Sequence, residues 1–238
     1  MLRYLKLIHF CIVKFGKELK GRNITERANE LISDIRHSPY IKFHCYTDDA
    51  KGLDDVFNVY TLNAEDREKH IHWNMMKFFD PEFIGAEEHD HTIYMDIDMD
   101  WNGPPNSVIN YQVGHREIVG IHRHWQNLEL KDKCPFHDSF IKFKSNELKF
   151  IHDRYFLYHE HYQAKYYRNG IVAKPRYGVQ NFIWETAQEA KMKIAYLPSS
   201  WVMKSHIEKH KIYAEQYQIH TGRNYYEDFD KAILHYNT

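Results

Sequence analysis

Three aspartates at alternating positions, Asp96, Asp98 and Asp100, are the residues of this sequence that most clearly suggest chemistry. They follow an apolar run, and alternate side chains of a β-strand point to the same face. Their carboxylates are therefore expected to crowd together and to repel one another unless a cation lies between them. From Asp80 to Asp100 the sequence has eight acidic residues and no Lys or Arg, so it offers no local counter-charge. The pattern predicts a site for Mg²⁺ or Mn²⁺, which prefer oxygen ligands and leave positions open for phosphates.

Alternating acidic residues also occur on ordinary solvent-exposed strands that bind no metal. Two other functional motifs have the same spacing of acidic residues. An EF-hand calcium loop counted from Asp96 requires Gly at its sixth position and Glu at its twelfth. The sequence has Trp101 and Ser107 there, which excludes that motif. A phosphatase of the haloacid-dehalogenase type would use Asp96 as its nucleophile, together with Asp98. Such a strand normally lies near the N-terminus and is followed by Thr or Val, where this chain has Asp100. The phosphatase is therefore retained as an alternative.

The elements that must position these acids alternate in type along the first half of the chain. An apolar run at about 5–13 is followed by a helical pattern at about 24–36, for which Asn23 is the expected N-cap. Further strands are predicted at about 41–46, 56–60 and 92–100, and a helix is predicted near 71–79. Alternating strands and helices indicate an α/β domain with a largely parallel sheet.

The second half has a less regular pattern. Strands are predicted there at about 108–113, 117–121, 139–143 and 194–197, and helices at about 145–161 and 178–191. No internal repeat, low-complexity tract or linker divides the chain. We therefore expect a single domain over residues 1–238.

The composition is that of a folded domain with unevenly distributed charge. Of the 238 residues, 43% are hydrophobic and 16% aromatic, which excludes disordered and low-complexity classes. The net charge of −1 argues against a globally basic nucleic-acid-binding protein. That value is a cancellation, because residues 1–120 carry 14 Lys and Arg against 20 Asp and Glu, and residues 121–238 carry 18 against 13. The basic excess suits a phosphate or an acidic acceptor, with Lys142, Lys174 and Arg176 as candidate contacts.

Cysteine usage and hydropathy predict a cytoplasmic protein. Cys11, Cys45 and Cys134 are odd in number and have no short paired spacing, so we expect reduced, mostly buried thiols. Lys6 and His9 interrupt the apolar run at the start of the chain, which makes a signal peptide improbable. No stretch approaches the roughly 18 apolar residues that span a membrane.

In order along roughly residues 11–237, several segments resemble the Asp-x-Asp glycosyltransferases with a Rossmann-like GT-A fold. The nearest resemblance is to small bacterial and viral members of the glycogenin and lipopolysaccharide-galactosyltransferase kind. The matching segments are Val13–Gly16, Phe43–Leu53, Trp73–Pro81, Tyr94–Asp98, Phe136–Phe143, Gly178–Gln180, Leu197–Trp201 and Ala232–Asn237. The resemblance implies a single domain with a mixed, mainly parallel central sheet flanked by helices. It also implies a nucleotide-binding half at about 1–101 and an acceptor-side half at about 102–238.

The same resemblance implies transfer of a sugar from a nucleotide-sugar donor, UDP-linked, to a glycan or another hydroxyl acceptor, with retention slightly favoured. A divalent ion, Mn²⁺ or Mg²⁺, would be held by Asp96, Asp98 and His235. Contacts to the nucleotide are implied for six residues, Val13, Lys14, Thr47, Asp48, Asp96 and Ile97. Asp138 and Gln180 would act near the sugar, and Asp138 would be the general base if the reaction inverts.

A non-enzymatic module remains a further alternative. The many Tyr, Trp and His side chains could stack on sugar rings or on nucleic-acid bases. The basic residues are scattered along the sequence rather than clustered, which makes this class less favoured than a transferase.

Overall fold

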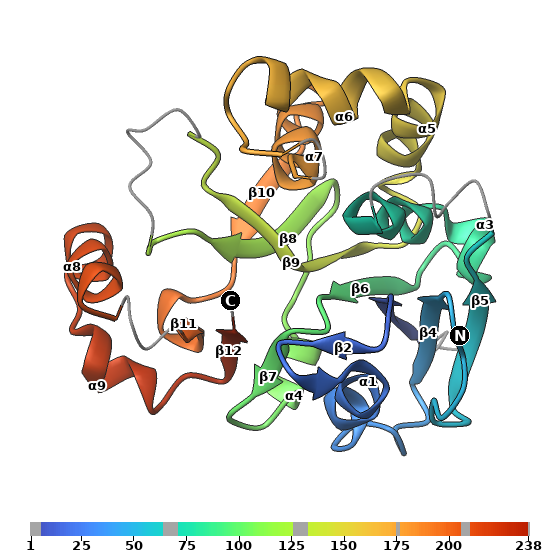
Figure 1. The fold of residues 1–238 in the computed structure, drawn as a ribbon, viewed down its shortest axis with the longest axis horizontal. Coiled ribbons are helices and arrows are strands. Elements are labelled where there is room, and N and C mark those ends of the chain that lie inside the picture. Colours follow the sequence, from blue (N-terminus) through green and yellow to red (C-terminus); the bar gives the residue numbers. More distant parts are fainter. Residues whose placement is uncertain (1–5, 64–70, 126–132, 175–176, 206–209, 238) are drawn as a thin grey trace, which may run out of the picture.

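A computed structural model describes residues 6–63, 71–125, 133–174, 177–205 and 210–237, and it is built around a seven-stranded sheet (Figure 1). The strand order is β10-β8-β9-β6-β1-β4-β5. The strands are β1 (Ile8–Lys14), β4 (Ile41–Thr47), β5 (Phe57–Thr61), β6 (His91–Met95), β8 (Glu117–His122), β9 (Phe136–Lys144) and β10 (Lys193–Tyr196). In this sheet β9 runs antiparallel to both neighbours and the other pairings are parallel. The expected mixed, mainly parallel sheet is therefore confirmed.

Two smaller sheets lie beside the central one. The first has the order β11-β12-β7, from β11 (Val202–Ser205), β12 (Leu234–Asn237) and β7 (Met99–Trp101). The second is a hairpin of β2 (Glu18–Leu19) and β3 (Arg22–Asn23). At the tip of the hairpin, Lys20 and Gly21 both have positive φ, at 54° and 76°, as a tight two-residue turn requires.

Helices flank the central sheet on both faces (Figure 1). They are α1 (Ile24–Ile32), the 3₁₀ helix η1 (Ile71–Phe79), α3 (Pro81–Ile84), α4 (Asn106–Ile109), α5 (Lys149–Leu157), α6 (His159–Arg168), α7 (Val179–Glu189), the 3₁₀ turn η2 (Ser199–Trp201), α8 (His210–Thr221) and α9 (Tyr225–Phe229). Among the described residues, no helix is long and apolar enough to cross a bilayer.

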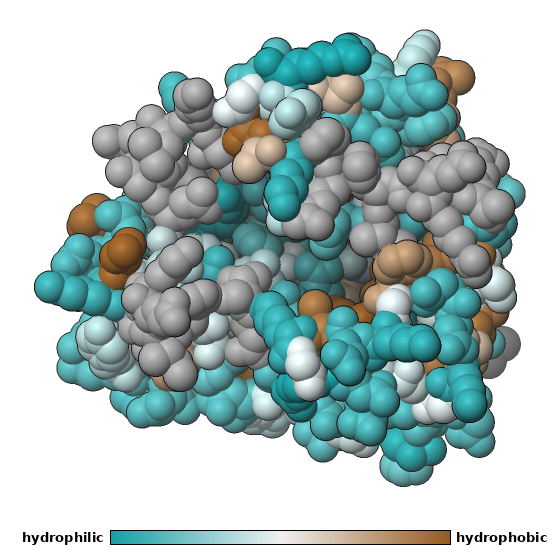
Figure 2. Space-filling view, in the orientation of Figure 1, coloured by the Kyte–Doolittle hydropathy of each residue, from teal (hydrophilic) through white to brown (hydrophobic). Residues whose placement is uncertain are grey.

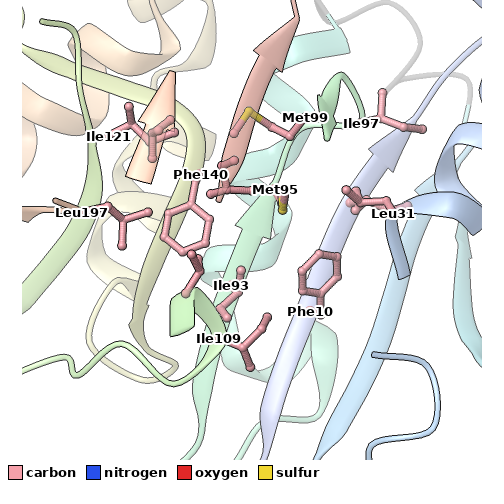
Figure 3. Close-up of a cluster of buried hydrophobic side chains, with 14 of the residues drawn as sticks. Phe10, Leu31, Ile93, Met95, Ile97, Met99, Ile109, Ile121, Phe140 and Leu197 are labelled. Atoms are coloured by element: carbon pink, nitrogen blue, oxygen red, sulfur yellow. The ribbon is translucent and has the colours of Figure 1, made fainter. Parts of the chain in front are cut away.

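The hydrophobic core has two parts, one on each face of the sheet. Figure 3 shows the first, where Phe10 of β1 and Met95 of β6 pack against Leu31 of α1 and Ile109 of α4. The second packs η1, α5, α6 and α7 against the opposite face, with Trp73 of η1 fully buried. Cys11, Cys45 and Cys134 are all buried, as expected, and none forms a disulfide bond.

Most elements expected in the first half of the chain are present. Asn23 is the N-cap of α1, because its Oδ1 accepts hydrogen bonds from the backbone N–H groups of Thr25 at 2.8 Å and Glu26 at 3.3 Å. The helix itself ends at Ile32, earlier than the periodicity suggested.

Two expectations for the second half are wrong. The expected strand at 108–113 does not form, because Pro105 opens a helical turn and its carbonyl accepts from the backbone N–H groups of Val108 and Ile109. The expected helix at 145–161 begins at Lys149 and breaks at Tyr158, where α5 ends and α6 follows at a new angle (Figure 1).

Lys142 also differs from its expected role as a contact for phosphate or an acidic acceptor. Its side chain is 1% exposed, and its Nζ donates to the backbone carbonyl oxygens of Ile109 and Tyr111. It therefore anchors the segment that follows α4 against β9. Burial lowers the pKa of Lys142 to about 8.

Lys142 is expected to contribute more to stability as the pH rises above about 8. Between pH 8 and the unfolded-state lysine pKa of about 10.4, the unfolded chain binds the additional proton at this residue, so the contribution of Lys142 to the free energy of unfolding increases with pH. The buried Cys11 and Cys45 thiols, whose pKa values are raised, act in the opposite direction in both wild type and variant. Urea unfolding at roughly pH 7.5 and 9.5 isolates the lysine, because relative to the wild type Lys142→Met should lack its increase. Lys144→Met removes a charge from the same strand and should retain it. The same pH dependence in wild type and Lys142→Met would contradict the assignment.

Candidate active site

Two adjoining cavities lie at the edge of the sheet where β1 and β6 end, which is the edge at which open α/β sheets bind ligands. We call them the polar cavity, of about 370 Å³, and the apolar cavity, of about 210 Å³. Both are lined by Tyr94, Asp96, Asp98 and His72. The face shown in Figure 2 is hollowed near its centre, and the lining there is largely hydrophilic. The two aspartates therefore stand where the cavities meet.

The acidic segment is a turn between two sheets, which corrects the expected strand at 92–100. Strand β6 ends at Met95, and the backbone N–H of Met99 donates to the carbonyl of Asp96 at 3.1 Å. The chain then enters β7, where Asp100 pairs in register with His235 of β12. Asp96 and Asp98 line the cavities, but Asp100 lines neither. The three carboxylates thus do not share one face, because the chain changes sheets between them.

Asp100 is held instead by a buried arginine of α1. The guanidinium of Arg27, which is 6% exposed, donates to the Asp100 carboxylate and to the carbonyl oxygens of Ile97 at 3.3 Å and Met99 at 3.1 Å. This side chain closes the turn that carries Asp98. It also supplies the counter-charge that the acidic segment itself lacks.

Each carboxylate oxygen of Asp96 accepts one hydrogen bond from a hydroxyl group. The Tyr94 hydroxyl donates to Oδ1 at 2.5 Å, and the Ser139 hydroxyl donates to Oδ2 at 2.7 Å. Burial, followed by the charge of Asp96, raises the pKa of Tyr94 well above its usual range, so Tyr94 remains a donor at neutral pH.

Asp98 has the opposite environment. Its Oδ1 is buried and has no hydrogen-bond partner among the residues that the structure describes. Its Oδ2 lies 3.8 Å from the Nζ of Lys20, on the β2–β3 hairpin. Burial and the nearby charge of Asp96 raise the pKa of Asp98. Mg²⁺ is typically bound through one or two carboxylates together with substrate phosphates, so an unpartnered carboxylate oxygen beside a second carboxylate fits such an ion.

The structure does not bring His235 to the two aspartates. Its Nε2 donates to the carbonyl of Phe229 at 3.0 Å, and its ring stacks on the Phe229 ring at 4.5 Å. Because side chains alternate along β12, the next residue, Tyr236, lines the polar cavity instead. Within the described ranges, no group of three or more His, Cys, Asp or Glu side chains is arranged to hold a metal.

The residues expected to contact a nucleotide divide into two sets. Val13, Asp96 and Ile97 line the apolar cavity, as does Phe15 of the expected nucleotide loop. Leu19 and Ile24 also line it and were missed by sequence reasoning. Leu19 lies on the β2–β3 hairpin, whose strands have two residues each and are too short to give a recognisable sequence pattern.

Lys14, Thr47 and Asp48 line neither cavity and support the loops around them. The buried Lys14 Nζ donates to Thr47 Oγ1 at 3.4 Å and to the carbonyl of Asp49 at 2.5 Å. The Asp48 carboxylate accepts from the backbone N–H of Gly16 at 3.1 Å. These contacts join the end of β1 to the end of β4.

Asp138 and Gln180, the expected catalytic residues, both line the polar cavity. Asp138 lies on β9, which is antiparallel, so the beginning of this strand meets the carboxyl ends of its neighbours. Burial and then the charge of Asp96 raise the pKa of Asp138. Gln180 is in the first turn of α7, after Gly178, whose φ is 105°.

Another wall of the polar cavity combines cations with aromatic rings and was not foreseen from the sequence. Its lining includes Arg123, Trp125, Lys204 and Tyr236. The Lys204 Nζ lies 5.1 Å from the centroid of the Tyr236 ring and 5.8 Å from that of Trp125. Burial, followed by the charges of Arg123 and Lys204, lowers the pKa of the neighbouring His137 well below its usual range, so this imidazole is neutral.

Comparison with known proteins gives matches at the level of structure. No protein-family model matches the chain, and no curated protein matches its sequence. The galactosyltransferase LgtC, solved in complex with donor and acceptor sugar analogs, is similar with a TM-score of 0.61 and 12% identity, over 96% of this chain and 86% of that one. The glycosyltransferase GlyE of Streptococcus pneumoniae TIGR4 is similar with a TM-score of 0.59 and 11% identity, over 97% of this chain and 54% of that one. This chain thus spans about half the length of the GlyE chain.

A glycosyltransferase involved in the glycosylation of the major capsid of PBCV-1 is similar with a TM-score of 0.53 and 12% identity. Here the match covers 97% of this chain and 92% of the other. At such low identities the likeness establishes the fold alone. The fold is the mixed α/β arrangement of the GT-A glycosyltransferases, as the sequence predicted.

Proposed function

We propose that this chain is a metal-dependent glycosyltransferase that moves a sugar from a nucleotide-sugar donor, UDP-linked, to a hydroxyl group of a glycan or another acceptor. The observation that carries the proposal is the position of Asp96 and Asp98 at the junction of an apolar and a polar cavity. A nucleotide-sugar would match this arrangement, because its diphosphate lies between a nucleoside, which suits the apolar cavity, and a sugar, which suits the polar cavity. The shared GT-A fold supports the same class of reaction.

Transfer requires that the diphosphate be stabilised as it leaves the sugar. A divalent ion, Mn²⁺ or Mg²⁺, held by Asp96 and Asp98 would supply positive charge there. The side chains of Val13, Phe15 and Leu19 would contact the nucleoside in the apolar cavity. This leaves the polar cavity for the donor sugar and the acceptor hydroxyl group.

In the polar cavity, Asp138 and Gln180 are the proposed residues near the sugar. Gln180 has an amide that can both donate to and accept from sugar hydroxyl groups. The raised pKa of Asp138 suits a general base if the reaction inverts. Retention, which the sequence resemblance favours, requires no such base. His235 would join the metal site only if β12 presented its other face.

The proposal treats residues 1–238 as a single transferase domain. The nucleotide-binding part, at about 1–101, includes the apolar cavity and the acidic turn. The acceptor-side part, at about 102–238, includes β9, α7 and the cation-aromatic wall. A cytoplasmic location stays a prediction from the sequence.

Thermal unfolding with UDP and Mn²⁺ tests the function. Because a ligand that binds only the folded state stabilises it, a concentration of about 100 times Kd adds about 2.7 kcal/mol. For a chain of this length that is a rise in Tm of about 5–10 °C. We expect the full rise only with UDP and Mn²⁺ together, and we expect EDTA to reverse it.

Two other outcomes would overturn the proposal. Stabilisation by an oligonucleotide without metal would favour the non-enzymatic module. Metal-dependent release of phosphate from a phosphomonoester, with no sugar donor, would favour the phosphatase. A screen of nucleotide-sugars for hydrolysis would then identify the donor.

A further inference from the structure

The carboxylate of Asp96 is fixed in orientation by hydrogen bonds from the protein itself. Tyr94 Oη and Ser139 Oγ approach its two oxygens at 2.5 and 2.7 Å, from β6 and β9. The backbone is fixed as well, because the Asp96 N–H donates to the Ser139 carbonyl at 2.8 Å. A side chain with both oxygens engaged cannot rotate without losing a charge-assisted hydrogen bond.

Both donors are themselves held rigidly. Tyr94 is 4% exposed, and its ring lies 6.3 Å from the ring of Phe78. Ser139 is fully buried on β9, in the strand pair that joins Met95 to Phe140. Neither hydroxyl is placed by chance contact with solvent, so their directions follow from the packing of the sheet.

The two carboxylates of the turn therefore differ in kind. Each oxygen of Asp96 keeps one lone pair after accepting its hydrogen bond, in a direction set by Tyr94 and Ser139. Asp98 Oδ1 has no partner among the described residues. A cation bound between the two carboxylates would be contacted by Asp96, which is already oriented, and by Asp98 Oδ1, which has no other partner among the described residues.

We propose that Tyr94 and Ser139 are positioning residues, which orient Asp96 so that its free lone pair faces the cation site shared with Asp98. This inference rests on the proposed function, because it assigns the cation to that site. Outer hydrogen-bond partners of metal ligands typically change metal affinity by about 10–100-fold. We expect the loss of either hydroxyl to weaken binding of Mn²⁺ within that range.

The test measures Mn²⁺ affinity of the full chain directly, by electron paramagnetic resonance of the free ion, without donor or acceptor. Tyr94→Phe keeps the ring and removes only the hydroxyl, and it should raise the Kd for Mn²⁺ about tenfold. Tyr60→Phe is the matched control, because it removes a hydroxyl that bonds His44 at 2.9 Å and lines neither cavity. It should leave the Kd unchanged.

Ser139→Ala provides a second, independent variant if Tyr94→Phe folds poorly. Because both hydroxyl groups act on one carboxylate, the double variant should lose less affinity than the product of the two single losses. High Mn²⁺ should restore sugar transfer to Tyr94→Phe, as expected when a positioning residue sets affinity. A purely structural role would lower Tm without moving the Kd.

The possible failures are distinguishable. If the wild type binds no Mn²⁺, the metal site and this inference fall together. If the wild type binds Mn²⁺ and both Tyr94→Phe and Ser139→Ala bind it equally well, only the positioning role is refuted. The proposed transferase would then stand.

Discussion

Asp98→Asn is expected to reduce sugar transfer about 10²–10³-fold while leaving the chain folded, because the carboxylate that would hold the divalent cation beside the leaving diphosphate is lost. The substitution keeps the size of the side chain, and Asp98 Oδ1 contributes no hydrogen bond among the described residues. The measurement pairs transfer from UDP-sugar with the Tm shift caused by UDP and Mn²⁺. Both should be lost together.

The same variant should be at least as stable as the wild type without ligands. Burial and Asp96 raise the pKa of Asp98 in the folded state, so the fold favours the neutral acid. A raised carboxyl pKa gives stability at low pH that is lost as the pH rises through the folded-state value. Near pH 8, removing this charge should therefore raise the Tm of the apo protein slightly.

Asp100→Asn is the matched control, since Asp100 lines neither cavity. It should keep most of the transfer activity and lose stability instead, because its carboxylate pairs with Arg27. Transfer unchanged in Asp98→Asn, or abolished equally in both variants, would contradict the assignment of the metal site.

The second large effect is expected for Arg27→Met. The change removes the buried arginine that pairs with the Asp100 carboxylate and that donates to the carbonyl oxygens of Ile97 and Met99. Losing several buried hydrogen bonds to a charged group should lower the free energy of unfolding by about 3 kcal/mol. For a chain of this length, the corresponding fall in Tm is about 6–12 °C.

Arg22→Met is the control for this effect. Arg22 pairs with Glu30, as Arg27 also does, but its side chain is 53% exposed. Surface ion pairs of this kind contribute about 0–1 kcal/mol. Equal losses of stability in the two variants, measured by urea unfolding, would show that burial of Arg27 has no special role.

Much of the fold could be predicted because its signals are local. The strands and helices of the first half follow hydrophobic periodicity, and the Asn23 cap follows from residue type. The break in the acidic strand was missed because β7 pairs with β12, a strand more than 130 residues further along the chain. Local sequence patterns do not indicate which distant strand β7 pairs with.

The candidate site could be predicted only in part for a similar reason. Asp96 and Asp98 were found from their spacing. Arg27 was overlooked, although a charged residue on the apolar face of α1, between Ile24 and Ala28, indicates a buried partner. Tyr94 could also have been identified, since it lies two residues before Asp96 and alternate side chains of a strand point to the same face.

His235 shows what remains out of reach. Whether this residue or Tyr236 points into the polar cavity depends on the register of β12 against β7. A shift of one residue would exchange them, and nothing in the sequence of β12 itself fixes that choice.

The contacts that hold the acidic turn also determine when the site comes into existence. Arg27 meets Asp100 across 73 positions of sequence, and Ser139 meets Asp96 across 43. Closing loops of that size costs chain entropy, so these contacts require the rest of the fold to be in place. Neither the acidic segment alone nor a fragment ending before β9 would have a shaped binding site. The proposed cation site thus depends on the completed fold.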